Sequence, residues 1–157
     1  MTTTRRRRER QELNPDLGVL AIQLAASMQR EFFSRLATEG YADLHARHAA
    51  VLAYLDEDGV RATELARLSG QHKQVVGRLI DELEELGYVE RRPDPGDRRA
   101  KLVVPTTRGL GMLQRGDEIV AEIEARHATA IGGRSYAEFR DALRGVVARG
   151  REPVPTA

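Results

Sequence analysis

The sequence of 157 residues predicts a mainly α-helical fold with one small β-hairpin (α+β), and its 41% hydrophobic content suffices for the core of one domain. Apolar residues recur at helical spacing in several segments, which predicts amphipathic helices. Glycines and polar turns separate those segments. Two β-prone runs, 88–92 and 99–104, flank the turn Pro93-Asp94-Pro95-Gly96-Asp97, which is typical of a hairpin.

The composition excludes several chemistries. Because no cysteine is present, disulfides, thiolate metal sites and thiol redox sensors are excluded. Lys and Arg number 25 against 24 Asp and Glu, so an anionic partner must be recognised by a local basic patch. No stretch approaches the roughly 20 apolar residues of a membrane span. We therefore expect no membrane contact, no export leader and a cytoplasmic location.

The N-terminal part is predicted to form an arm and a long helix. Residues 1–13 are polar and charged, so we expect a disordered basic arm. Asn14, Pro15 and Asp16 are predicted as N-cap, first residue and dipole-matched acid of a helix that ends at Gly40. Its apolar residues recur at helical spacing: Leu17, Leu20, Leu24, Met28 and Phe32.

Three shorter helices and a brief strand are expected next. A helix over 44–55 has one apolar face, formed by Leu44, His48, Val51 or Leu52, and Leu55. Val60 is expected in a brief strand, residues 63–68 in a short helix and Ser69-Gly70 in a tight turn. A strongly amphipathic helix covers 73–86 and ends at Gly87. Its inward positions are Val76, Leu79, Leu83 and Leu86, flanked by Val75 and Ile80.

Two helices are predicted after the hairpin. Thr106 is expected to cap a helix that runs to residue 131, in which each of three glycines costs about 1 kcal/mol relative to alanine. Ser135 and Glu138 form the S-x-x-E pattern of a capping box for a last helix. The apolar face of this helix comprises Phe139, Leu143 and Val146 or Val147. The tail 150–157 is expected to be loose.

The helices at 63–68 and 73–86, with the turn between them and the hairpin after them, have the order and lengths of a winged helix-turn-helix. If the apolar positions of the second helix point inward, its N-terminal half presents Lys73, Gln74, Gly77 and Arg78 outward. Lysine and arginine reach phosphates or guanine, glutamine reads adenine, and glycine permits close approach. The alternative is an ordinary solvated helix face.

The hairpin supplies the local basic patch. Its cations lie within eleven positions and are Arg91, Arg92, Arg98, Arg99 and Lys101. A cationic hairpin tip suits the negative potential of a narrow minor groove. We expect Asp97 to orient Arg99 through a charge-assisted hydrogen bond. The alternative is a charged edge hairpin that only resists aggregation.

The segment KQVVGRLIDELEELGYVERRPDPGDRRAKLVVPTTRG resembles the recognition helix and wing of the MarR family of transcription regulators. The resemblance includes the D-x-R pattern at Asp97 and Arg99, Leu102, Thr106 and Gly109, and helix order agrees over 14–147. It implies a homodimer that binds a roughly palindromic double-stranded DNA site and responds to a small ligand.

The implied organisation has five parts. Residues 1–13 form the arm, 14–42 an N-terminal dimerisation helix and 43–105 the winged DNA-binding module. Residues 106–149 form C-terminal dimerisation helices, and 150–157 the tail. Two positions depart from the family pattern. His72 stands where Ser or Thr commonly caps the recognition helix and contacts DNA, and Pro105 replaces a common Leu.

Weaker signals concern a ligand, a metal and the arm. Phe32, His48 and Tyr54, together with Phe33, are candidates to line the cavity of an aromatic or anionic effector, and core packing is the alternative. His45 and His48 are three residues apart, but no third ligand is evident, so we expect no metal. Arg5 to Arg8 either follow DNA or are a solvated end.

Together with what the resemblance implies, the sequence therefore predicts a ligand-responsive, homodimeric repressor without enzyme activity or cofactor. Nucleophile elbows, phosphate-cradling glycine loops and unexplained carboxylate pairs are absent from the sequence. Two other hypotheses stay open: a winged-helix module for protein interaction or dimerisation without a DNA target, and a small ligand-modifying enzyme. Steep salt dependence of duplex binding separates the first of these from a DNA-binding regulator.

Overall fold

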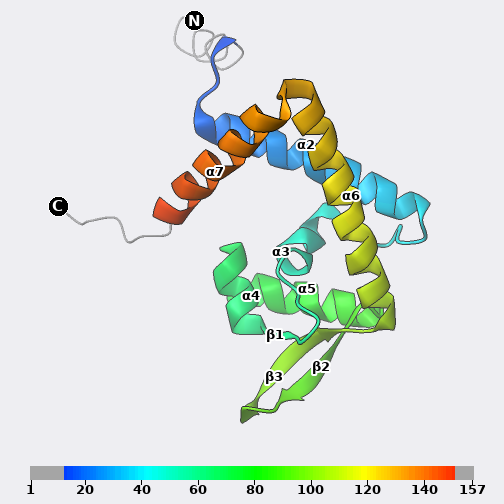
Figure 1. Cartoon of the computed structure of the whole chain (residues 1–157). Coiled ribbons are helices and arrows are strands. Elements are labelled where there is room, and N and C mark those ends of the chain that lie inside the picture. Colours follow the sequence, from blue (N-terminus) through cyan, green and yellow to red (C-terminus); the bar gives the residue numbers. More distant parts are fainter. Residues whose placement is uncertain (1–12, 151–157) are drawn as a thin grey trace, which may run out of the picture. The chain divides into compact units, whose positions relative to one another are not determined.

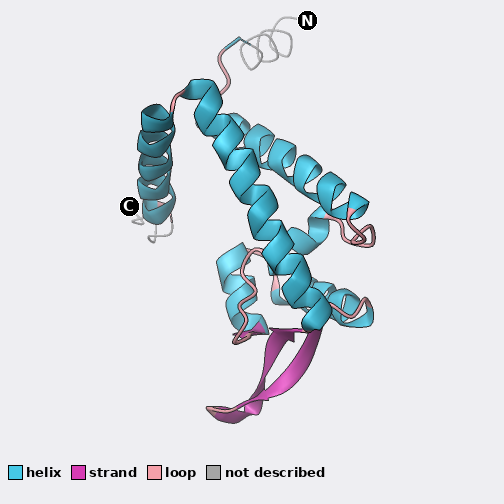
Figure 2. Cartoon of the chain, turned by 45° about the vertical axis from the view of Figure 1, so that its right-hand side comes forward, coloured by secondary structure: helices cyan, strands magenta, loops and turns pink. Residues whose placement is uncertain are grey.

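The computed structural model describes residues 13–150, apart from the side chain of Arg98. Helices and one three-stranded antiparallel sheet make up the described part (Figures 1 and 2), which confirms the predicted fold class. The chain divides into two compact units, Met1–Asp117 and Glu118–Ala157. The arm, with Arg5 to Arg8, and the tail lie outside the described residues except for their inner ends, Leu13 and Gly150.

The first long helix, α2, covers Leu17–Thr38 and is capped by Asp16. The Asp16 backbone is extended, and its side chain accepts a hydrogen bond of 3.0 Å from the Val19 N–H. The prediction of Asn14 as N-cap and Pro15 as first helical residue is therefore wrong, because the aspartate satisfies the first-turn donors two residues later. Gly40 has φ +97°, as the predicted end of the helix requires.

The predicted helix over 44–55 is wrong in extent. A 3₁₀ turn, η1 (Ala46–His48), is followed by one helical turn, α3 (Ala49–Leu52). His45 is extended, and its N–H donates to Nδ1 of His48 (3.1 Å) instead of entering a helix. At the other end the Tyr54 N–H bonds three residues back to the Val51 carbonyl, so the helix does not continue. Of the predicted inward residues, Leu44, His48, Val51 and Leu52 are nevertheless buried, whereas Leu55 is half-buried.

The helix-turn-helix lies where the sequence predicts it. Helix α4 covers Ala62–Ser69, Gly70 adopts the left-handed conformation with φ +68°, and α5 covers Lys73–Glu85. The inward face of α5 is buried at Val76, Leu79, Ile80 and Leu83, while Leu86 is half-buried. Because α5 packs on η1, α3, α4 and β2, only its outward face stays exposed.

The sheet consists of β1 (Val60–Arg61), β2 (Val89–Asp94) and β3 (Asp97–Pro105), in the order β1-β3-β2. The hairpin prediction is confirmed, and β2 and β3 extend further than expected, up to Asp94 opposite Asp97. The ribbon formed by these two strands projects away from α4 and α5 (Figure 1). We call this ribbon the wing.

The long helix α6 (Thr107–Ile131) begins against the base of the wing. The hydroxyl of Thr106 accepts a hydrogen bond of 3.1 Å from the Gly109 N–H, which confirms the predicted cap. A Cβ atom added at Gly109 would lie 2.0 Å from the Tyr88 carbonyl oxygen. The helix and β2 can therefore approach this closely only because position 109 has no side chain.

The last helix, α7 (Gly133–Arg149), does not have the predicted capping box. Its N-cap is Gly132, with φ +90° and no side-chain cap bond, so Ser135 and Glu138 already lie inside the helix. No residue of α7 is buried in the single chain. Its apolar side chains Phe139, Val146 and Val147 are 43%, 51% and 49% exposed.

We expect Gly109→Ala to destabilise the protein by about 1–3 kcal/mol, because the new methyl group must displace backbone. Gly111→Ala is the matched control, since its Cβ would lie 3.5 Å from the Tyr41 hydroxyl, an ordinary contact. There alanine should stabilise the helix by up to about 1 kcal/mol. Urea denaturation at one protein concentration measures both changes. A stabilising Gly109→Ala would contradict the close approach.

Candidate nucleic-acid interface

The front half of α5 presents the predicted polar face. Lys73, Gln74 and Arg78 are exposed, and Gly77 is half-buried. Within residues 13–150, the side chains of Lys73 and Arg78 form no ion pair or hydrogen bond. The two cations are therefore available to an external anion, and Gln74 lies between them in the sequence with a donor and an acceptor.

The start of α5 lacks a side-chain cap. His72 is the N-cap residue, extended and exposed, and its ring makes no capping hydrogen bond. The departure from Ser or Thr at this position thus leaves the first-turn N–H groups to water or to an external acceptor. A phosphate oxygen is the kind of acceptor that a helix N-terminus favours.

Two of the predicted wing cations have partners inside the protein. Arg91 contacts the carboxylates of Asp81 (2.5 Å) and Glu84 on α5, and its N–H donates to Glu84 as well (3.1 Å). Arg92 pairs with Glu90 beside it (Nε to Oε1, 2.7 Å) but is 65% exposed. The geometry therefore favours a structural role for Arg91, which joins the wing to α5, and leaves Arg92 accessible.

At the wing tip, Asp97 does not orient the Arg99 guanidinium as predicted. Its Oδ1 accepts a hydrogen bond of 3.0 Å from the Arg99 backbone N–H instead. The carboxylate thus shapes the turn, and the side chains of Arg99 and Lys101 are exposed and unpaired within the described part of the chain. The side chain of Arg98, another predicted contact, lies outside the described residues.

The sequence reasoning missed Arg61 at the end of β1. Its Nε donates to Oδ2 of Asp94 at 2.7 Å, and its Nη2 lies 3.8 Å from Oδ2 of Asp97. The only indication in the sequence near Arg61 was the brief strand predicted at Val60. The pairing of β1 with β3, which brings Arg61 to the wing, could not be deduced from that segment alone.

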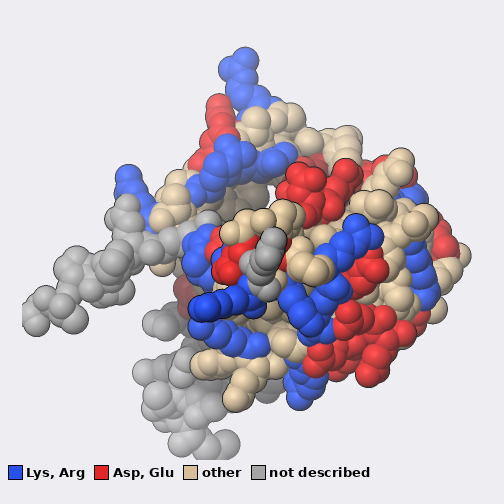
Figure 3. All heavy atoms as spheres, turned by 90° about the horizontal axis from the view of Figure 1, so that it is seen from below, with Lys and Arg blue, Asp and Glu red and all other residues tan. Residues whose placement is uncertain are grey.

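The face from which the wing projects combines both signs of charge. In Figure 3, many Lys and Arg side chains lie toward the middle of this face, the largest group of Asp and Glu lies to one side, and other acidic side chains lie among the cations. A chain with a net charge of +1 thus has the local cationic region that an anionic partner needs.

A second interaction missed from the sequence joins the loop after α2 to the wing base. The Tyr88 hydroxyl, fully buried with its ring, donates to Asp43 (2.5 Å), and Arg108 donates to the other Asp43 oxygen (2.9 Å). The Arg108 guanidinium also lies 4.3 Å from the centre of the Tyr88 ring. Burial, and then the neighbouring Asp43, raise the pKa of Tyr88.

His48 links η1 to α5. It has no exposed surface, and its Nε2 lies 3.1 Å from the Glu82 carboxylate, which also accepts from Arg47 (2.8 Å). Because Nδ1 accepts the His45 N–H, the proton of the neutral ring belongs on Nε2, where it is donated to Glu82. Burial lowers the pKa of His48, against the opposing effect of Glu82.

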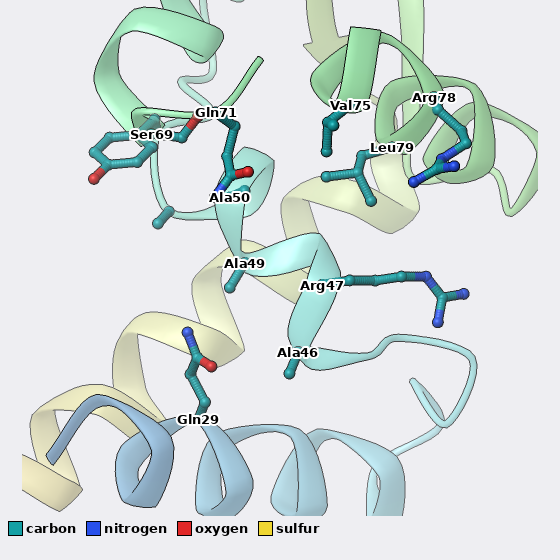
Figure 4. Close-up of a pocket in the computed structure, with 12 residues that line it drawn as sticks. Gln29, Ala46, Arg47, Ala49, Ala50, Ser69, Gln71, Val75, Arg78 and Leu79 are labelled. Atoms are coloured by element: carbon teal, nitrogen blue, oxygen red, sulfur yellow. The ribbon is translucent and has the colours of Figure 1, made fainter. Parts of the chain in front are cut away.

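A pocket of about 490 Å³ lies between α2, α3 and the front of α5. Figure 4 shows Gln29 extending from α2 toward α3, and Val75 and Leu79 facing the pocket from α5. Among the ligand candidates, Tyr54 lines it and Phe32 and His48 do not. Phe32 packs edge-on against Phe33, with ring centres 5.0 Å apart.

The pocket shares a residue with the candidate DNA-binding face. Arg78 and Arg47 are the two cations of its lining, and both come from elements around the front of α5. Much of the remaining lining is small: Ala46, Ala49, Ala50 and Ala53. The pocket therefore combines an apolar wall with the guanidinium group of Arg78, whereas that of Arg47 is already paired with Glu82.

Residues 13–150 lack two further features. In this range no three His, Asp or Glu side chains are grouped so that they could hold a metal ion. None of the described helices has both the length and the apolar character of a membrane-spanning segment.

Part of the chain is similar in sequence to known transcriptional regulators. The MarR family model matches residues 42–100. The Bacillus subtilis (strain 168) protein YcgE, an uncharacterised HTH-type transcriptional regulator, is 44% identical over 54 residues, which are 34% of this chain and 35% of that protein. The chain therefore matches about a third of the length of this curated relative.

Solved structures extend the similarity to most of the chain. CouR of Rhodococcus jostii RHA1, bound to p-coumaroyl-CoA, is 27% identical with a TM-score of 0.70, over 92% of this chain and 96% of that one. The transcriptional repressor CouR bound to a 23-mer DNA duplex is 27% identical, with a TM-score of 0.67 over 91% and 97%.

We expect the lowered pKa of His48 to make stability depend on pH. The unfolded chain, with the ordinary histidine pKa of about 6.5, binds the proton more readily than the folded chain. This contribution to the free energy of unfolding is complete above about pH 7 and is lost as the pH falls through 6.5 toward the folded pKa.

Denaturation of the native chain and of His48→Gln between about pH 7.5 and 5.5 measures this dependence. The variant should be less stable at the upper end and should lose less stability across the range. The carboxylates of Glu82 and Asp43, whose pKa values are lowered, titrate below it. Parallel curves for the two proteins would contradict the role of His48.

Proposed function

Because the chain belongs to the MarR family of winged helix-turn-helix transcriptional regulators, we propose that it is a ligand-responsive repressor that binds a pseudo-palindromic DNA operator as a homodimer. The observation that carries this proposal is the set of unpaired cations on two adjoining elements, the front of α5 and the wing tip. Membership in this family places the chain among regulators rather than enzymes.

In the proposed complex the front of α5 enters the major groove and the wing reaches the flanking minor groove. Lys73, Gln74, Gly77 and Arg78 supply the groove contacts, and the α5 N-terminus beside His72 binds a phosphate. Arg99, Lys101 and Arg92 supply the wing contacts. The CouR repressor, of similar fold, has been solved on a DNA duplex, which supports this arrangement.

The proposed homodimer accounts for apolar surface that each unit leaves exposed. On α2, Leu17, Leu20 and Ile22 are 55%, 48% and 71% exposed, and the apolar side chains of α7 are exposed as well. Contiguous exposed apolar residues mark a protein interface. We assign residues 14–42 and 106–149 to dimerisation and 43–105 to DNA binding. Two-fold symmetry would then place two α5 helices about one DNA turn apart, roughly 34 Å.

The proposed effector is an aromatic or anionic small molecule that binds in the pocket beside α5, with Tyr54 on its wall. CouR, which was solved with p-coumaroyl-CoA, shows that a protein of this fold accommodates an aromatic acyl thioester. Because Arg78 lines the pocket and also belongs to the proposed DNA face, an anion that binds it would draw it away from DNA. The chain would act in the cytoplasm, where its DNA target lies.

Selection of bound duplexes from a random pool tests the DNA-binding proposal. The selected sequences should contain a two-fold repeat, with binding that weakens steeply as salt rises. Arg99→Ala should weaken binding to the selected duplex by about 1–3 kcal/mol in a titration, whereas Arg144→Ala, which removes a cation of α7, should not. Failure to enrich any duplex would favour a protein-interaction module instead.

A thermal-shift screen with aromatic carboxylates and aromatic acyl-CoA thioesters tests the pocket. At least one compound should stabilise the native chain and release the selected duplex. Ala50→Trp fills the pocket and should abolish both effects, whereas Ala37→Trp, on the exposed side of α2, should preserve them. A shift that persists in Ala50→Trp would place the ligand elsewhere.

A further inference from the structure

We infer that Arg61 is a positioning residue for the wing: it holds the outer turn, which Arg99 follows in β3, in place relative to the helix-turn-helix, without itself contacting DNA. This inference rests on the proposed function for its consequence in DNA binding. The restraint on the wing is a property of the protein alone and can be measured without DNA.

The position of Arg61 in the chain suits this role. It is the last residue of β1 and the N-cap residue of α4, so its backbone belongs to the junction between the sheet and the helix-turn-helix. Its Nε and Nη2 lie 2.7 Å and 2.5 Å from the same oxygen of Asp94, and Nη2 lies 3.8 Å from Asp97. Both carboxylates belong to the wing turn.

Asp94 transmits the contact to the turn itself. While its Oδ2 accepts from Arg61, its Oδ1 accepts the Gly96 N–H at 2.8 Å, so one carboxylate joins both groups. The Asp94 side chain is only 12% exposed, whereas that of Arg61 is 45% exposed. The Gly96 N–H and then Arg61 lower the pKa of Asp94, so the pair is ionised at neutral pH.

The wing needs such a restraint because its sheet is incomplete. The third strand, β1, pairs only with Val103 and Leu102 of β3. Beyond these residues the wing is a two-stranded ribbon, and its register shifts between Pro93 and Asp94. A two-stranded ribbon alone is marginally stable in water. The Arg61 side chain reaches past the end of β1 and extends the support of the third strand to the tip.

Arg91 and Arg61 together hold the two ends of the wing. Arg91 binds Asp81 and Glu84 and so ties the ribbon to α5. Arg61 ties the outer turn to the start of α4. With both contacts in place, the position of Arg99 relative to the exposed face of α5 is fixed before DNA binds. Less conformational entropy is therefore lost when the complex forms.

The alternative is that Arg61 binds a phosphate directly, and Asp94→Asn separates the two roles by the sign of its effect. The asparagine keeps an acceptor for the Gly96 N–H but loses the charge that holds Arg61. If Arg61 binds phosphate, removing a nearby negative charge and freeing the arginine should tighten DNA binding. If Arg61 positions the wing, the same change should weaken it.

The test compares Arg61→Gln, Asp94→Asn and the double variant on the duplex selected by the native chain, with Asp58→Asn as a control for charge loss in an exposed loop. Each single variant should bind at least about fivefold more weakly, the factor that corresponds to roughly 1 kcal/mol. The double variant should bind DNA no more weakly than the weaker-binding single variant, because both substitutions break the same ion pair. The slope of log Kd against log salt should stay unchanged.

Amide hydrogen exchange on the free protein tests the restraint directly. The Gly96 and Arg99 N–H groups should exchange at least about fivefold faster in both single variants, and not in the control. Unchanged exchange would overturn the inference. The inference would also be overturned if Asp94→Asn bound DNA more tightly and Arg61→Gln had a slope of log Kd against log salt that was smaller by about one. That smaller slope identifies a phosphate contact. A native chain that binds no duplex would refute the proposed function, while the exchange rates would still decide the restraint.

Discussion

The packing around Tyr88 is the constraint on which the arrangement of the first unit depends. Its hydroxyl donates to Asp43, and its carbonyl accepts the Thr106 N–H at 3.0 Å. Gly109 approaches that same carbonyl so closely that no side chain fits at position 109. One buried residue therefore joins the loop after α2, the base of the wing and the start of α6, and the start of α6 meets the wing base through backbone contacts.

The charged side chains of α5 and the wing fall into two groups. Most of the acidic side chains are paired with basic ones inside the protein, whereas several basic side chains on the proposed DNA face have no partner within the described part of the chain. On α5, Asp81 and Glu84 bind Arg91, and Glu82 binds Arg47 and His48. These pairs satisfy carboxylates that would otherwise repel a phosphate backbone. The unpaired cations lie at the front of the same helix and at the wing tip. The net charge of +1 thus conceals a surface on which charge is unevenly distributed.

The sequence predicted the helix-turn-helix, the wing and the cap of α6 because these depend on local rules. Helical periodicity, turn-forming residues and helix caps all involve residues only a few positions apart. Thr106 as the cap of α6 and Gly70 in the turn after α4 are examples. The same rules gave wrong predictions where two neighbouring residues or groups could form the same cap or hydrogen bond. Asp16 capped α2 in place of Asn14, Gly132 replaced the expected capping box of α7, and the His48 ring took the His45 N–H that a longer helix would have used.

What the sequence by itself determined is the order of the elements, their apolar faces and the set of polar residues that we propose as DNA contacts. Only the tertiary structure decided which of those residues have partners: Arg91 is held by α5, Asp97 bonds to backbone, and Arg61 reaches the wing from β1. The physical reason is range. Periodicity acts within one element, whereas an ion pair between residues 33 positions apart exists only once the strand register has brought them together.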